Sequence, residues 1–154
     1  MTSLKEAIIE VTKEVTKVER KQEIDSLGRA YGTGRRKNSS ARVWIKKGTG
    51  KFTINGREFK SYFGRAILGT IVKQPLVATK TENKFDITAT ASGGGLTGQA
   101  GAILLGISRS LVSFDPELHL TLRSEGFLTR DPRVVERKKY GRKKARKGQT
   151  YRKR

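Results

Sequence analysis

Apolar and polar residues alternate along residues 41–46 and 85–90, and this two-residue period predicts β-strands with one buried face. The apolar positions of the two stretches are Val43, Ile45, Phe85, Ile87 and Ala89. Residues 30–34 and 51–54 are also expected to be strands. A tight turn is expected at Asn55–Gly56, a dipeptide that favours hairpins.

A spacing of three and four residues replaces this alternation further along the chain and predicts helices. The strongest helix is expected over residues 96–111, where the apolar positions are Leu96, Ala100, Ile103, Leu104, Ile107 and Leu111. Shorter helical pieces are expected over residues 57–65 and 67–72. We expect an interruption near Gly64 and an end before Pro75, which lacks the amide that a helix interior needs.

Two Asp-Pro pairs indicate further helix starts. Asp115–Pro116 places Asp at the N-cap and Pro at the first helical position, and Gly126 is the expected end. Asp131–Pro132 repeats this signal, and Gly141 could end a second such helix. Strands followed by helices, with a strand between helical segments, predict an α/β fold in the sense of an α+β sandwich of a sheet and helices.

The first 27 residues have the pattern of an amphipathic helix. Ser3–Glu6 fits a capping box, and apolar residues follow at positions 4, 8, 11, 15 and 18. A helix that pairs with a partner and a frayed appendage both remain open, with the second favoured because β-branched residues lower helix propensity. The six acids and the absence of an apolar core argue against a targeting peptide. No apolar run approaches the roughly 20 residues of a membrane helix.

Positive charge increases toward the carboxyl end of the chain, whose formal net charge is +20. Residues 127–154 hold thirteen Lys or Arg against two acids, and residues 28–126 carry a net charge of +10. The last segment has too few apolar groups to offset the cost of ordering its backbone, so we expect a polyanion to order it. Three parts are therefore expected: an extension over 1–27, a globular RNA-binding domain over 28–126 and an extended basic tail over 127–154.

A basic stretch between the first two predicted strands is the first candidate site. Its cations are Arg35, Arg36, Lys37 and Arg42. Arginine forks match phosphate oxygens and lysine supplies a point charge, so this stretch is expected to bind RNA. The alternative is a hairpin edge that its charges protect from aggregation.

A glycine-rich turn before the strongest helix is the second candidate. Its residues are Gly93, Gly94, Gly95, Thr97, Gly98 and Gln99. Backbone amides at the positive end of a helix can hold a phosphate. A small-molecule nucleotide site is disfavoured because the Gly-Lys-Ser/Thr pattern is missing. Contact with an RNA phosphate and close packing of helix on sheet remain as explanations.

The basic tail is the third candidate, and its expected RNA contacts are Arg130, Arg133, Arg137, Lys138, Lys139, Arg142, Lys143, Lys144, Arg146 and Lys147. Tyr140 and Tyr151 could stack on a base or a sugar. A solvated, mobile appendage is the alternative.

Catalysis is not expected. The sole histidine, His119, lies among leucines, and no carboxylate pair is evident for acid–base work or metal binding. Without cysteine, thiolate metal sites are excluded. We therefore expect no catalytic residue, no metal and no cofactor.

Several motifs in unbroken order resemble a known family over residues 28–154. They are Gly34–Lys37 with Ala41–Val43, Gly93–Gly95 with Gly98–Ile103, Arg130–Arg133 with Val135–Gly141, and a final Lys153–Arg154. Together they resemble the S-nine ribosomal protein family of the small subunit, in its bacterial form. The resemblance implies an S-five domain-two-like fold, cytoplasmic residence in the ribosome, and binding to small-subunit ribosomal RNA in the head beside neighbouring head proteins.

The resemblance also implies a role for the end of the tail. Tyr151, Arg152, Lys153 and Arg154 would approach the anticodon stem-loop of transfer RNA in the peptidyl site. The chain departs from the family at Arg152, where serine is typical, and at Gln149, which lies earlier than usual. The arginine at position 152 adds a positive charge to the end of the tail.

Overall fold

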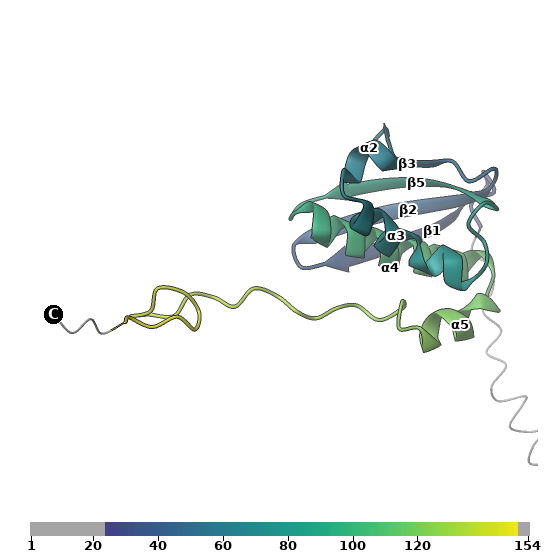
Figure 1. Ribbon diagram of the computed structural model, residues 1–154. Helices are drawn as coiled ribbons and strands as arrows, with labels where there is room; N and C mark the ends of the chain where they lie inside the picture. Colours follow the sequence, from purple (N-terminus) through teal and green to yellow (C-terminus); the bar gives the residue numbers. More distant parts are fainter. Residues whose placement is uncertain (1–23, 151–154) are drawn as a thin grey trace, which may run out of the picture.

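The computed structural model describes residues 24–150 of the chain. In this part, five strands form one mixed sheet and four helices pack beside it, an α+β fold consistent with the S-five domain-two-like type (Figure 1). The strands are β1 (Ala30–Arg36), β2 (Ser39–Lys47), β3 (Phe52–Ile54), β4 (Arg57–Glu58) and β5 (Phe85–Ser92). The helices are α2 (Phe59–Phe63), α3 (Ala66–Ala78), α4 (Leu96–Phe114) and α5 (Leu118–Ser124).

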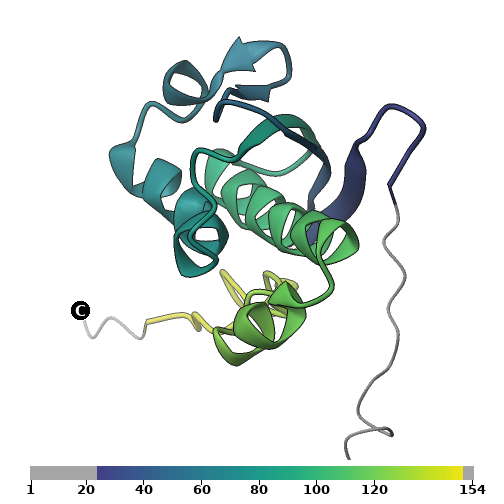
Figure 2. The same cartoon turned by 90° about the vertical axis from the view of Figure 1, so that its right-hand side faces the viewer.

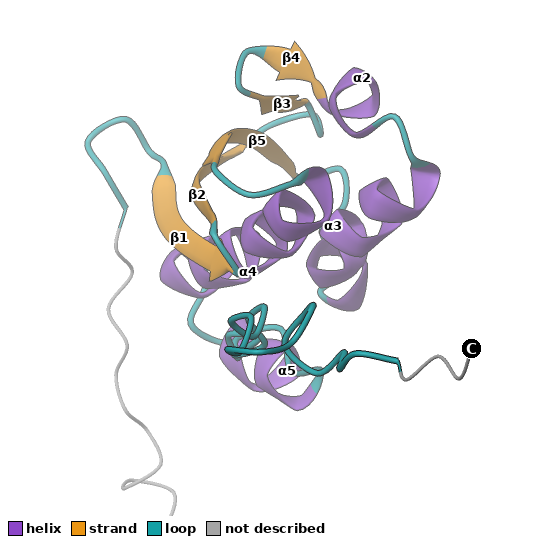
Figure 3. Cartoon of the chain, turned by 90° about the vertical axis from the view of Figure 1, so that its left-hand side faces the viewer, coloured by secondary structure: helices purple, strands orange, loops and turns teal. Residues whose placement is uncertain are grey.

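The strand order in the sheet is β1-β2-β5-β3-β4, so β1 lies at one edge. β1, β2 and β5 are antiparallel neighbours, whereas β3 runs parallel to β5. Helices α3 and α4 lie on one side of this sheet, and in the described residues no helix covers its other face (Figure 3). The alternation of buried and exposed residues along β1, β2 and β5 follows from this one-sided cover.

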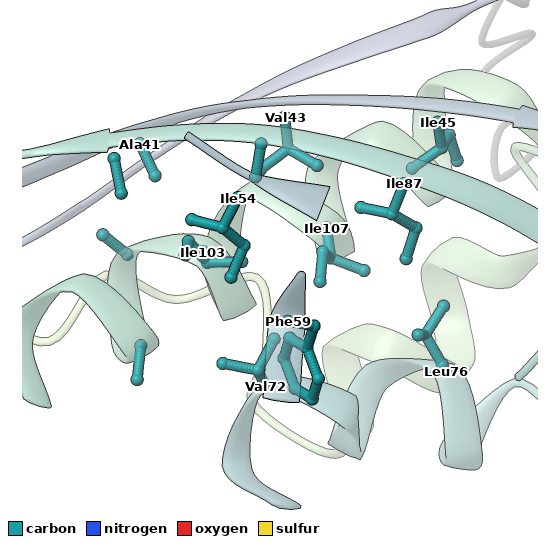
Figure 4. Close-up of a cluster of buried hydrophobic side chains, with 14 of the residues drawn as sticks. Ala41, Val43, Ile45, Ile54, Phe59, Val72, Leu76, Ile87, Ile103 and Ile107 are labelled. Carbon is teal, nitrogen blue, oxygen red and sulfur yellow. The ribbon is translucent and has the colours of Figure 1, made fainter. Parts of the chain in front are cut away.

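The hydrophobic core lies between the sheet and the helices (Figure 4). Val43 and Ile45 of β2 are opposite Ala89 and Ile87 of β5, and all four point toward the helix layer. Other core side chains are Ile54, Phe59, Val72, Leu76, Ile103, Ile107 and Leu111. Each large apolar side chain contributes about 1.5–3 kcal/mol when fully buried, so this layer supplies most of the fold's stability.

Glycines bring the backbone of α4 directly against β1. A Cβ atom on Gly34 would collide with the carbonyl oxygen of Ala102, and one on Gly32 would collide with that of Gly106. Gly106 in turn faces the Val43 side chain without room for a Cβ atom. Glycine at these positions is therefore a packing requirement of the helix–strand contact.

The predicted strands are confirmed, with different ends at the basic stretch. β1 continues to Arg36 and β2 begins at Ser39, so only Lys37 and Asn38 lie in the turn. The expected basic loop is thus a tight hairpin whose cations project from strands. Asn55 and Gly56 have φ angles of 49° and 75° and form the expected turn.

The helix expected over residues 57–65 was wrong at its start. Arg57 and Glu58 pair with β3 as β4, because the Asn55–Gly56 turn reverses the chain back onto that strand. Gly64 does interrupt the helical region, with a φ angle of 57° in the left-handed range. α2 and α3 lie on either side of this glycine.

The expected end before Pro75 was also wrong, since α3 continues to Ala78. Pro75 removes one helical hydrogen bond, but its ring is buried beside Val72 and Leu76. The Thr79 hydroxyl donates to the Pro75 carbonyl oxygen at 2.9 Å and closes the last turn. Burial and this side-chain bond together offset the missing amide.

α4 is confirmed and extends three residues beyond the predicted end. The helix predicted to start at Pro116 begins two residues later, because α5 starts at Leu118 with Glu117 at its N-cap. Asp115 instead accepts a hydrogen bond from the Glu117 amide at 3.1 Å, which stabilises the turn before the helix. Gly126 has a φ angle of 77°, and the Phe127 amide donates to the Leu122 carbonyl oxygen. This arrangement is the expected glycine stop.

The helix suggested for residues 131–141 was wrong, because that segment has no helical structure. Val134 is 66% exposed, Val135 is 85% exposed, and Tyr140 is fully exposed. Short helices in proteins depend on packing an apolar face, and this segment packs none. The amphipathic pattern expected at residues 4–18 lies outside the described residues.

Replacing Gly34 by alanine should destabilise the protein by about 1–3 kcal/mol or more, because the added methyl group meets backbone atoms of α4 that cannot rotate away. Urea denaturation measures the change in the free energy of unfolding. Gly95→Ala is the matched control, since its Cβ atom meets nothing within 4 Å. Equal denaturation midpoints for the two variants would contradict the packing requirement.

Candidate nucleic-acid interface

The β1–β2 hairpin presents cations from both strands and from its turn. Arg35, Lys37 and Arg42 are exposed, and among residues 24–150 no carboxylate pairs with them. Arg42 lies on the open face of β2, opposite Thr33 of β1 and Thr90 of β5. All three are predicted RNA contacts, and their exposed charges could reach phosphate oxygens.

A hollow of about 620 Å³ lies where the open face of the sheet meets the β1 edge. Its basic lining comes from Arg35, Arg42, Arg109 and Arg130, and no carboxylate lines it. Arg109 donates from Nη1 to the Thr33 carbonyl oxygen at 2.9 Å, so it is held at the edge strand. Sequence reasoning missed Arg109, because only the glycine contact of α4 with β1 brings this helix residue there.

The glycine-rich turn packs against the hairpin. The Ser39 hydroxyl donates to the Gly93 carbonyl oxygen at 3.0 Å. Cβ atoms on Gly94 and Gly98 would both crowd that hydroxyl oxygen. Close packing therefore accounts for Gly93, Gly94 and Gly98, whereas Gly95 and Thr97 are exposed at the start of α4.

Gln99 belongs to a hydrogen-bond network within the fold. Its Nε2 donates to the Gly93 carbonyl oxygen at 3.2 Å, and its Oε1 accepts from the Tyr62 hydroxyl at 2.6 Å. The side chain of Asn55 both donates to the Ala91 carbonyl oxygen and accepts from the Ala91 amide. The network fixes the turn, and both polar atoms of Gln99 are already engaged.

Arg36 differs from the other hairpin cations because its guanidinium contacts Asp131 at the root of the tail. The distance from Arg36 Nη2 to Asp131 Oδ2 is 3.2 Å, and both side chains are about three-quarters buried. The Arg36 side chain crosses Gly101, where a Cβ atom would collide with it. Arg36, predicted as an RNA contact, is thus also a tether between body and tail.

Asp131 receives a second arginine from its own segment. Arg133 donates to the carboxylate from Nε at 2.9 Å and from Nη2 at 2.8 Å, and its backbone amide adds a bond at 3.1 Å. These hydrogen bonds, with the charges of Arg133 and Arg36, hold the pKa of Asp131 far below its usual range. The carboxylate stays ionised and keeps both arginines in place.

Residues 136–147 form a loop in the tail, seen toward the yellow end of the ribbon in Figure 1. Arg146 Nε donates to Glu136 Oε2 at 3.0 Å, and this bond lowers the pKa of Glu136. The Lys143 amide donates to the Lys147 carbonyl oxygen at 3.0 Å. The ion pair therefore closes a loop whose other side chains point into solvent.

Seven tail cations within residues 136–147 are exposed and have no carboxylate partner in the described part of the chain. They are Arg137, Lys138, Lys139, Arg142, Lys143, Lys144 and Lys147. Tyr140 between them is fully exposed. The predicted contacts Tyr151, Arg152, Lys153 and Arg154 lie outside the described residues.

Other chemistry has little support in the described part of the chain. Residues 24–150 hold no group of three or more His, Cys, Asp or Glu that could bind a metal ion. Their helices are all too short or too polar to cross a membrane. A hollow of about 820 Å³ lies beside α2, α3 and Phe127, with a largely apolar lining.

A family model described as ribosomal protein S9/S16 matches residues 34–154. The match begins within β1 and covers the end of that strand, the hairpin turn, β2, the glycine-rich turn and the whole tail.

The attachment of the tail root should depend on pH through Asp131. Because its pKa is depressed in the folded protein, attachment is complete above the usual carboxyl pKa of about 4 and is lost as the pH falls through the folded value. The Asp131→Asn substitution should release the root at neutral pH. In NMR spectra of the Asp131→Asn protein, the amide resonance of Arg133 should then move toward the position expected for a random coil.

Glu136→Gln is the control for this experiment, because it removes the other tail ion pair and leaves the root intact. An Arg133 amide that keeps its position in the Asp131→Asn protein would show that the carboxylate does not hold the root.

Proposed function

This chain belongs to the ribosomal protein S9/S16 family, and we propose from that premise that it binds ribosomal RNA in the head of the small subunit and contacts peptidyl-site transfer RNA with the end of its tail. Family membership gives it the role of a small-subunit ribosomal protein, located in the ribosome. That role is structural and not enzymatic. The motifs resemble the bacterial form, and we assign the chain to that form as part of the proposal.

The observation that carries the proposal is the surplus of unpaired cations along an extended tail. Both acids of residues 127–150 already bind arginines, so the remaining cations repel one another in the free protein. RNA phosphates neutralise such charges and release condensed counterions, which favours binding. The tail is therefore suited to a space between RNA segments that would otherwise repel each other.

The proposed division of labour follows the three parts of the chain. Residues 28–126 form the body that docks on folded RNA through Arg35, Lys37 and Arg42. Residues 127–154 form the tail in this scheme. Its start is fixed by Asp131, and its described part, residues 127–150, leads away from α5 (Figures 1 and 2). Residues 1–27 are a separate extension in this scheme.

The start of α4 adds a further proposed contact. This helix has nineteen residues, and the exposed Gly95 and Thr97 lie at its positive end. A backbone phosphate of the RNA can accept hydrogen bonds from the free amides of the first turn. Packing explains the neighbouring glycines, so the proposed contact is confined to these two residues.

The end of the tail is assigned to transfer RNA. Arg152, Lys153 and Arg154 supply donors for phosphate oxygens, and Tyr151 supplies an aromatic ring for a base or sugar. Contacts to the nucleic-acid backbone carry little sequence information. One tail can therefore serve every transfer RNA that enters the peptidyl site.

Deleting residues 152–154 should weaken retention of transfer RNA in the peptidyl site while leaving incorporation into the subunit intact. Filter binding of transfer RNA to purified mutant and parent subunits measures the affinity. The difference should shrink at higher salt, because the lost contacts are ionic. Equal affinities at every salt concentration would remove the tail end from the proposal.

Replacing five of the cations of the tail loop by glutamine should impair assembly. The changed residues are Arg142, Lys143, Lys144, Arg146 and Lys147. The slope of log Kobs against log salt for ribosomal RNA should decrease by about 4, since each contact contributes roughly 0.7–0.9. Co-sedimentation with small subunits after a moderate salt wash tests whether the variant is retained.

The control carries five glutamines at exposed positions of the body outside the β1–β2 hairpin, at Lys60, Arg65, Lys80, Lys84 and Arg123. It has the same net charge as the tail variant and should co-sediment like the parent. Full retention of the tail variant in mature subunits would show that the loop is not an assembly contact.

A further inference from the structure

The open face of the sheet carries an aromatic pair that the fold does not need for its core. Tyr31 of β1 and Trp44 of β2 are direct partners in the strand register. Their ring centroids are 5.4 Å apart, with an angle of 42° between the planes. Tyr31 is 43% exposed and Trp44 is partly exposed, on the face opposite the helices. Apolar surface in this position is typical of a binding site.

Cations surround this pair on the same face. Arg42 lies two residues from Trp44 along β2, so their side chains project in the same direction about 7 Å apart. The hollow lined by Arg35, Arg42, Arg109 and Arg130 begins beside Tyr31. Flat rings thus lie next to guanidinium groups, with no carboxylate lining the hollow to compete for them.

Small hydroxyl side chains cover much of the remaining open face. They are Thr33 of β1, Ser40 of β2, and Thr88, Thr90 and Ser92 of β5. Such groups both donate and accept hydrogen bonds and leave room for a ligand above the strands. A ligand that fits has an aromatic plane, anionic groups a few ångströms away, and hydroxyl groups.

We propose that this face binds an unpaired RNA nucleotide, with its base stacked on Tyr31 and Trp44 and its phosphates held by Arg35 and Arg42. The proposal rests on the proposed function and specifies that the body binds RNA that is not base-paired. A double helix does not fit, because the faces of its bases are stacked on one another and are not free to stack on the two rings. Aromatic side chains on an open sheet are an established means of stacking single-stranded bases.

Trp44 is the sole tryptophan of the chain, so its fluorescence reports on this face directly. The full-length protein is titrated with a single-stranded RNA 12-mer, an RNA duplex of the same length and inorganic polyphosphate. The single strand should quench Trp44 emission saturably, whereas the duplex and polyphosphate should bind the basic residues without comparable quenching. Equal quenching by all three ligands, or none by the single strand, would overturn the stacking site.

Substitutions at Tyr31 separate stacking from charge. Tyr31→Leu should weaken binding of the single strand about tenfold, because the base loses one of the rings on which it stacks. Polyphosphate affinity should not change, and Tyr31→Phe should retain single-strand binding because it keeps the ring. Leu120→Ala, which removes an exposed apolar side chain of α5, is the control and should leave Trp44 quenching intact. Equal affinities for Tyr31→Leu and Tyr31→Phe would overturn the proposal.

Failure of this inference is distinguishable from failure of the proposed function. If the protein co-sediments with small subunits but single-stranded RNA does not quench its Trp44 emission, the ribosomal role stands and only the stacking site is overturned. A photo-crosslinking residue at position 31 gives the corresponding result in assembled subunits. A crosslink to RNA supports the site, and a crosslink to a protein alone identifies a different occupant and overturns it.

Discussion

The close approach of α4 to β1 determines where the surface chemistry of this protein lies. Gly34 and Gly106 leave no side chain between the helix and the edge strand. Because α4 is this close, Arg109 reaches a β1 carbonyl oxygen and Arg36 crosses Gly101 toward the tail. In residues 24–150, α3 and α4 lie on the same side of the sheet, and no helix covers the opposite face. Basic residues of the body, the tail root and the open face are thus positioned by one backbone contact.

Acidic residues act within this basic protein as internal ligands. Asp131 holds Arg36 and Arg133, and Glu136 holds Arg146. In the body, the Asp86 carboxylate accepts hydrogen bonds from the backbone amides of Thr49 and Lys51, and these bonds lower the pKa of Asp86. Each carboxylate therefore fixes local geometry and leaves most cations unpaired. A few well-placed acids define the shape of the tail root and loop, and the excess charge remains available to RNA.

Sequence patterns correctly predicted the strands, turns and helix ends that depend only on neighbouring residues. The alternation around Val43 and Ile45, the Asn55–Gly56 turn and the Gly126 stop each depend on neighbouring residues, and each is confirmed. The predictions at Pro75 and over residues 131–141 were wrong because tertiary packing decides both structures. Burial of Pro75 keeps α3 helical beyond it, whereas residues 131–141 have no packed apolar face and form no helix. The sequence identifies the basic residues as a group, but it does not show that Arg36 pairs with Asp131, which lies 95 positions further along the chain. No local pattern indicates such a contact.

Two kinds of contact in the proposed RNA complex respond differently to salt. The tail binds through many exposed charges, and such binding weakens steeply as salt competes for phosphates. Base stacking on Tyr31 and Trp44 depends on ring overlap, so it changes little with ionic strength. In the body, stacking then supplies a part of the contact that resists salt, beside the ionic contacts of Arg35 and Arg42, and the tail adds affinity along the length of the RNA. A body that docks first also orients the tail, because Asp131 at the start of the tail is bound to Arg36 of the same hairpin.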